Sequence, residues 1–240
     1  MVRINQITEQ ERDTIRRIED NCRKLHLPSP PKTTIVLSVY TPDGQQTLAL
    51  TRLAKSWTRN GYNHMCIHLM GSHMNIGSGF GAGKLGVKDN DTTVYSAAYV
   101  TSPFGDVASG CYLGNDASAA NPGIIIGTGT GAENFEGYVI GTKINHGTGA
   151  GQMHYHAQAT AGISYDAGTK VFTAIHRRSF DNFSGAAITV AESAWYAHFF
   201  NAVPQHQYLM LSRDLFSPAI EVANRYRLTV DYQLQITYPA

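Results

Sequence analysis

Histidine is the residue type of this sequence best suited to holding a metal ion, and two of its ten histidines stand two positions apart. His154 and His156 fall in a segment of strand-like composition, in which residues i and i+2 face the same side. Such a pair holds a metal ion only when further ligands, commonly a Glu and another His, converge on it. No Glu follows His156 before Glu192. We therefore treat His154 and His156 as weak metal candidates and predict neither a metal nor another cofactor.

The glycines form a second motif with chemical potential. The apolar run Ile124–Ile126 leads into G-T-G-T-G-A (127–132), which matches the G-x-G-x-x-A opening of a dinucleotide-binding unit. That unit needs a helix directly after the glycines and an acid at the end of its second strand. The residues that follow show no helical period, and no acid lies between Asn145 and Tyr165. We interpret these glycines as turns between strands.

No arrangement of acids or nucleophiles indicates catalysis. The sequence has no G-x-S-x-G motif and no Cys with a matching His motif. Glu192 stands alone in the strand-like segment 189–196, so we predict that it faces outward or pairs with an Arg. Arg213 and Asp214 have the same structural character. The chain is predicted not to be an enzyme.

Residues 1–32 are predicted to form a helical arm and a Pro-rich linker. Thr8 and Glu11 have the spacing of a capping box, and prolines at 28, 30 and 31 end the helix. A narrow apolar stripe at 3-4-3 spacing lies between these signals, made of Ile15, Ile18, Cys22 and Leu25. Two heptads are too few for a stable free coiled coil. These four residues are therefore predicted to dock the helix, either on its own body or on a neighbouring subunit.

Residues 33–240 are predicted to form a mainly β domain with one internal helix. Two β-rich runs joined by a T-P-D-G turn predict a hairpin over 33–50. The period then becomes helical over 51–70, and the glycine-rich residues 71–91 are predicted to form a long loop. Residues 92–240 are predicted to form a β-sandwich.

The C-terminal half carries the strongest pattern. Strands are predicted over 152–165, 170–180, 187–200 and 207–211. In the last strand, Arg227–Tyr238, apolar and polar residues alternate, so a one-residue slip would expose five large apolar groups. The predicted fold class is mainly β, an antiparallel β-sandwich or barrel with an N-terminal helical arm and one internal helix.

Composition narrows the classes of function. A net charge of +1 provides no strong positive field, which argues against nucleic-acid binding. Three widely spaced cysteines fit a reducing compartment better than a disulfide framework. Neither a signal-peptide pattern nor a run of 18 apolar residues is present, so no membrane association is expected. Charged residues make up only 15% of the chain, which lowers the cost of dehydrating large protein interfaces.

The order of motifs after residue 122 resembles that of virion structural proteins of tailed bacteriophages. The shared features are turn and strand signatures at 127–130, 146–152, 180–185 and 211–214, followed by the final alternating strand. The resemblance implies a homo-oligomeric protein, made in the host cytoplasm and localised to the virion. Its implied partners are capsid, portal or tail proteins, in a tail, neck, fibre-base or capsid-decoration position.

Two other functions stay open. Exposed Trp and Tyr side chains beside loop Asn and Asp residues could stack on sugars, with Trp195-Tyr196 and the 71–91 loop as candidate places. The chain would then be a carbohydrate- or receptor-binding module of a phage appendage. The third interpretation is a cupin-like metal-dependent enzyme built on His154 and His156.

Overall fold

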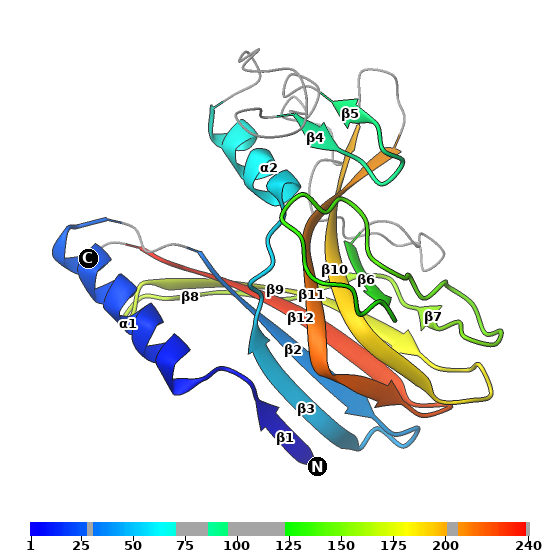
Figure 1. Ribbon diagram of the computed structural model, residues 1–240. Coiled ribbons are helices and arrows are strands. Elements are labelled where there is room, and N and C mark those ends of the chain that lie inside the picture. Colours follow the sequence, from blue (N-terminus) through cyan, green and yellow to red (C-terminus); the bar gives the residue numbers. More distant parts are fainter. Residues whose placement is uncertain (28–30, 71–85, 96–122, 201–205, 239–240) are drawn as a thin grey trace.

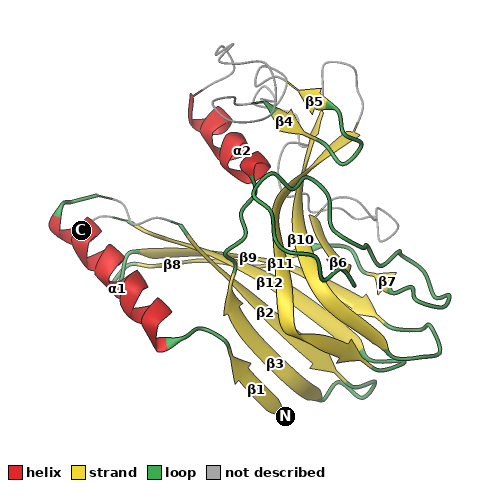
Figure 2. Cartoon of the chain, viewed as in Figure 1, coloured by secondary structure: helices red, strands yellow, loops and turns green. Residues whose placement is uncertain are grey.

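The computed structural model describes residues 1–27, 31–70, 86–95, 123–200 and 206–238. These residues form two helices and twelve strands, so the predicted mainly β class is confirmed (Figure 2). The helices are α1 (Glu9–Lys24) and α2 (Arg59–Met70).

Two sheets account for most of the strands. The larger has the order β1-β3-β2-β12-β9-β7, with β8 also paired to β9. Its strands are β1 (Val2–Asn5), β2 (Lys32–Tyr40), β3 (Gln46–Leu53), β7 (His154–Tyr155), β8 (Ala159–Asp166), β9 (Val171–Asp181) and β12 (Arg227–Thr237). The smaller sheet has the order β11-β10-β6, with β6 (Gly123–Gly127), β10 (Ile188–Phe200) and β11 (His206–Val222). A separate pair joins β4 (Val87–Lys88) and β5 (Val94–Tyr95).

The two sheets pack face to face around one main core (Figure 1). Strand β12 lies in the middle of the larger sheet, antiparallel to both β2 and β9. Its predicted alternation is confirmed for Leu228, Val230 and Tyr232, which are fully buried against the smaller sheet, while Leu234 and Ile236 farther along are only half-buried. The opposite face of β12 is less exposed than the alternation suggests, because Thr229 and Asp231 are covered by side chains of the neighbouring strands. A sandwich, and not a closed barrel, is the observed architecture.

Beyond the sandwich, β10 and β11 continue as a long antiparallel pair that carries a second, smaller cluster. Ala197, Leu209 and Leu211 of this pair pack with Val87 of β4, and Trp57 and Tyr95 flank the cluster. Helix α2 contacts the same part of β11 (Figure 1).

The predicted helix over 51–70 is too long at its start. Residues 51–53 continue β3, where Leu53 is registered with Thr34 of β2, and the helix begins only at Arg59. Thr58 provides the start signal, because its hydroxyl oxygen accepts a hydrogen bond from the Gly61 N–H at 3.3 Å. The hairpin predicted over 33–50 is confirmed and extends three residues further.

Three further expectations need correction. The predicted arm contains a strand as well as a helix, because β1 pairs in parallel with β3. The strand expected over 207–211 runs on to Val222, past Arg213 and Asp214, whose charged side chains are buried inside the sandwich. Of the predicted loop 71–91, residues 71–85 lie outside the described ranges, and the remainder contains β4. At the start of the predicted sandwich 92–240, only Val94–Tyr95 is described as a strand before residue 123, and 96–122 lie outside the described ranges.

Candidate functional site

Helix α1 presents its apolar stripe to solvent. The predicted capping box is present, with Thr8 accepting from the Glu11 N–H at 3.2 Å and Glu11 accepting from the Thr8 N–H at 2.9 Å. No residue of the helix is buried. Within the stripe, Ile15 and Cys22 are half-buried, while Ile18 is 43% and Leu25 67% exposed. The described part of the chain therefore leaves Ile18 and Leu25 uncovered, and covers Ile15 and Cys22 only in part.

Charged contacts hold α1 beside the larger sheet. Lys55 forms an ion pair with Glu11 at the start of the helix, and Lys32 Nζ lies 4.0 Å from the Glu19 carboxylate farther along. A hollow of about 300 Å³ lies between helix and sheet, and Ile15 is one of its lining residues. The helix is positioned by polar tethers and is not packed into the core.

The charges of α1 are balanced within the helix itself. From Glu9 to Lys24 the helix has five acidic and five basic residues, so its net charge is 5 − 5 = 0. Three pairs at i,i+3 spacing join these charges: Arg12–Glu9 at 2.6 Å, Arg16–Asp13 at 3.4 Å and Arg23–Asp20 at 3.1 Å. Exposed pairs of this kind add little stability. They do leave the helix without a net charge that would select an oppositely charged partner.

Both edges of the larger sheet are open among the described residues. Strand β1 pairs only with β3, and β8 pairs only with β9. In β8, Ile163 is 66% and Tyr165 54% exposed. Soluble proteins usually protect edge strands with Lys, Pro or a bulge. Strand β8 contains neither Lys nor Pro, and its protection is a register irregularity between Thr160 and Gly162.

The glycines at 127–131 surround a buried carboxylate, and no helix follows them. Glu192 of β10 is fully buried and accepts hydrogen bonds from the backbone N–H groups of Gly129 at 2.9 Å, Gly141 at 3.2 Å and Thr142 at 2.7 Å. Arg213 Nε donates to the same carboxylate at 2.5 Å, which confirms the predicted pairing with an Arg. A Cβ atom on Gly129 would overlap the Glu192 carboxylate. The motif is thus glycine-rich because the loop approaches Glu192 closely.

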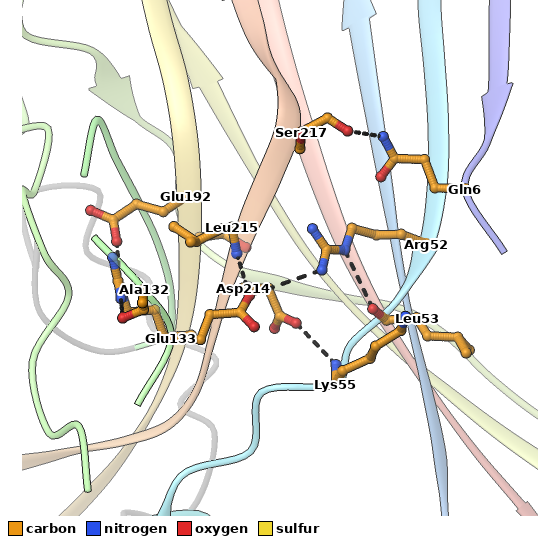
Figure 3. A network of polar contacts seen from close by, with 12 residues as sticks. Gln6, Arg52, Leu53, Lys55, Ala132, Glu133, Glu192, Asp214, Leu215 and Ser217 are labelled. Atoms are coloured by element: carbon orange, nitrogen blue, oxygen red, sulfur yellow. Dashed lines mark hydrogen bonds and ion pairs between the residues drawn. The ribbon is translucent and has the colours of Figure 1, made fainter. Parts of the chain in front are cut away.

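Asp214 of β11 lies beside this cluster and is also fully buried. Its Oδ1 accepts a hydrogen bond from the Lys55 N–H at 3.1 Å, while Oδ2 has no hydrogen-bond partner among the described residues. Figure 3 shows Asp214 near Arg52 and Lys55, with Glu133 bound to the Leu215 N–H at 2.8 Å. Burial raises the pKa of Asp214 to about 6, although the charge of Arg52 acts in the opposite direction. A raised carboxyl pKa often marks a functional group, but a fully buried Asp214 is out of reach of a ligand in solvent.

The structure brings a third histidine to the predicted pair. The ring centroids of His146 and His154 are 5.0 Å apart, and those of His154 and His156 are 5.1 Å apart. Nδ1 of His146 accepts a hydrogen bond from the Tyr155 N–H at 3.1 Å, and Nε2 of His156 lies 2.7 Å from Oδ2 of Asp181. Within the described ranges, no group of three or more His, Cys, Asp or Glu side chains is arranged to hold a metal ion.

Comparison of the chain with models of protein families, with curated proteins and with solved structures found no match. No helix in the part of the chain that the structure describes has the length and apolarity needed to span a bilayer.

The prediction that Trp195 and Tyr196 stack on sugars is wrong. Both side chains are in the core, at 3% and 2% exposure, because their part of β10 faces the larger sheet and the loop after β6. Trp195 stacks on Tyr232 with ring centroids 5.3 Å apart, and the Tyr196 hydroxyl oxygen accepts from the Ile140 N–H at 2.8 Å.

The buried polar groups of this chain therefore position loops and strands, while three surfaces are available to a partner. These are the apolar stripe of α1, the edge of β8, and the outer face of the larger sheet. Sequence reasoning found only the first. The edge position of β8 follows from the order of the strands, and so does the way in which charged residues of separate strands come together on the outer face. Local sequence patterns do not contain this order.

Proposed function

We propose that this chain is a self-assembling structural protein of a virion, and that α1 docks on a second copy of the chain. The observation that carries the proposal is the stripe of α1, which is apolar, flanked by self-balanced charges and uncovered at Ile18 and Leu25. Large apolar side chains held in a row on a helix face are typical of helix–helix contacts between subunits.

A second copy is the partner that best fits this stripe. The 3-4-3 spacing of Ile15, Ile18, Cys22 and Leu25 is that of a coiled-coil seam, and such a seam packs on an identical row from a neighbour. Because the helix has no net charge, packing two copies together brings no net repulsion. The tethers at Glu11 and Glu19 already hold the helix in place, so part of the entropy cost of docking is met before association.

The virion assignment is supported by the resemblance of the motifs after residue 122 to those of tailed-phage virion proteins. Its physical support is a rigid two-sheet body that offers a docking helix and an open sheet edge. Capsid, portal or tail subunits are the proposed further partners, and the virion is the proposed location.

The first prediction concerns the oligomer. Changing Ile18 and Leu25 together to Ser should raise the dissociation constant of self-association at least tenfold, because burying each side chain contributes roughly 1.5–3 kcal/mol. Sedimentation equilibrium of the full chain over a range of concentrations measures this constant. The matched control is Arg17→Ser, an exposed position of the same helix that forms no salt bridge with any described residue.

Thermal midpoints at low concentration should be the same for wild type and both variants, since the stripe adds little to the fold of one copy. A wild-type chain that stays monomeric at high concentration would rule out the docking role. The same conclusion would follow if Arg17→Ser raised the dissociation constant of self-association as much as the double variant does. Mass spectrometry of particles purified from the host tests the virion assignment. Particles that lack this chain would overturn it.

A further inference from the structure

A groove of about 570 Å³ crosses the outer face of the larger sheet, away from the core. Three neighbouring strands build its floor. Arg227 of β12 is registered with Tyr40 of β2 on one side and with Asp181 of β9 on the other. Two residues farther along, the hydroxyl oxygens of Thr229 and Ser179 lie 3.1 Å apart. The floor therefore alternates charged groups with hydroxyl groups.

Two Arg–Asp pairs of opposite orientation flank these hydroxyls. Arg227 donates to both carboxylate oxygens of Asp181, at 2.6 and 3.0 Å, and Arg177 donates to both oxygens of Asp231, at 2.7 and 2.6 Å. Burial alone would raise the pKa of Asp181, but hydrogen bonds from Arg227 and His156 hold it below its ordinary value. Asp181 is therefore ionised at neutral pH, and the bidentate hydrogen bonds of both pairs hold the guanidinium groups of Arg227 and Arg177 in fixed positions.

The Arg side of each pair is left open to a ligand. The side chains of Arg177 and Arg227 are each 49% exposed, while those of Asp231 and Asp181 are 7% and 10% exposed. Each bidentate pair uses Nε and one terminal nitrogen, which leaves the other terminal nitrogen with two N–H donors. The two pairs are four residues apart along the strands, a distance of about 13 Å. A ligand that met both would be elongated.

A third guanidinium has no ion-pair partner among the described residues. Arg225 lies in the turn before β12 and has a φ of 69°, a left-handed conformation that side chains other than glycine rarely adopt. The backbone N–H of Arg225 donates to the Asn182 carbonyl oxygen at 2.6 Å, which ties the turn to the end of β9. The three arginines and the two aspartates of the groove give a local charge of 3 − 2 = +1.

Aromatic side chains complete the groove. Tyr40 lines it from β2, and Phe183 lines it from the turn after β9, where it is 46% exposed. Aromatic faces pack on the C–H faces of sugar rings, and hydroxyl groups such as those of Ser179 and Thr229 can both donate to and accept from sugar hydroxyls.

We propose that this groove binds an acidic saccharide, meaning linked sugar rings that carry carboxylate or sulfate groups. The anionic groups would contact Arg225 and the open edges of Arg177 and Arg227, and the rings would lie over Tyr40, Phe183 and the neighbouring hydroxyls of Ser179 and Thr229. A nucleic acid carries one phosphate per nucleotide and is bound mainly by uncompensated positive charge. In this groove Asp231 and Asp181 neutralise two of the three arginines, so the groove lacks the uncompensated positive charge on which nucleic-acid binding depends. The site is separate from α1 and does not depend on self-assembly.

The test uses the full chain and calorimetric titration with three probes at physiological salt. They are an oligogalacturonate, a neutral glucose oligomer of the same number of rings, and inorganic sulfate. The oligogalacturonate should bind at least tenfold more tightly than the neutral oligomer. Arg225→Gln should weaken its binding about tenfold, whereas Arg17→Gln, which removes the same charge from α1, should leave binding unchanged.

Phe183→Ala separates a saccharide site from a simple anion site. It should weaken oligogalacturonate binding several-fold and leave sulfate binding unaltered. Phe183 is 46% exposed, so we expect the variant to fold, and its thermal midpoint checks this. The proposal is overturned by three results: no binding of the oligogalacturonate, equal losses in Arg225→Gln and Arg17→Gln, or an unchanged affinity in Phe183→Ala. Binding of single-stranded DNA as tightly as the oligosaccharide would also overturn it.

Discussion

Asp214 couples the stability of this chain to pH. Its pKa is raised by burial from the model-peptide value of 3.8 to about 6 in the fold, so the folded chain binds a proton more tightly than the unfolded chain. The ionised carboxylate therefore costs the folded state free energy. The cost is absent below pH 4, grows as pH rises, and reaches ~3 kcal/mol above pH 6, since one pKa unit corresponds to roughly 1.4 kcal/mol.

Asp214→Asn removes this charge and keeps an oxygen that can accept from the Lys55 N–H. The free energy of unfolding of the variant, relative to wild type, should be about 2–3 kcal/mol larger at pH 7.5 than at pH 4, because the variant does not carry the cost of a buried ionised carboxylate. Urea titrations at several pH values give this difference. Asp91→Asn, an exposed position, is the control and should show a flat difference, and a flat difference for Asp214→Asn would contradict the argument.

Gly129 and Gly131 allow a matched comparison of two Gly→Ala substitutions in the same loop. A Cβ on Gly129 would overlap the Glu192 carboxylate and lie 2.9 Å from the Thr142 nitrogen, whereas a Cβ on Gly131 has nothing within 4 Å. Gly129→Ala should lower the free energy of unfolding by about 1–3 kcal/mol, as expected for overpacking. Gly131→Ala should change it by less than about 0.5 kcal/mol. Equal effects would show that the loop does not need to approach Glu192.

Local signals predicted the elements whose structure depends on neighbours in sequence. The capping box of α1, the hairpin of β2 and β3 and the alternation of β12 were all readable, because each follows from spacings within a few residues. The length of β11 could not be predicted from the sequence, because the strand runs through the charged residues Arg213 and Asp214. Strands tolerate such charges only when distant partners satisfy them, and Arg213 finds its partner, Glu192, across the sheet.

The same reasoning explains which parts of the candidate surfaces could be predicted. The stripe of α1 repeats along one helix, so the sequence contained it in full. The groove arginines come from β9, β12 and the turn between β11 and β12, and only the strand order places them together. Trp195 and Tyr196 were misplaced because residues 190–197 are all buried, so the sequence does not show which side of this strand faces the core.

The open edge of β8 leads to a prediction about aggregation. Because β8 has open backbone groups and exposes Ile163 and Tyr165, it should take part in association through strand addition. Ile163→Lys should slow aggregation on heating, as followed by light scattering, without lowering the thermal midpoint by more than a degree or so. Thr169→Lys, in the turn after β8, adds the same charge away from the edge and should have a weaker effect.

At the scale of the whole molecule, the sequence left a sandwich and a barrel equally open. The distinction depends on whether the outer strands meet, and β1 and β8 do not pair with each other. The open edges are therefore a property of the complete strand order. Like the stripe of α1, the open sheet edges are surfaces that a single copy of the chain does not use.

Strands β10 and β11 both reach from the sandwich core to the cluster that holds α2 and β4. Their registered pairs run from Ile188–Val222 to Phe200–His206, with register shifts at Val190/Glu192 and Trp195/Tyr196. A pull on the α2 end would act along these strands, so the hydrogen bonds that join β10 to β6 would share the load in shear and would not open one at a time. The long strand pair gives the molecule a stiff mechanical axis, along which tension at one end reaches the loop around Glu192 at the other.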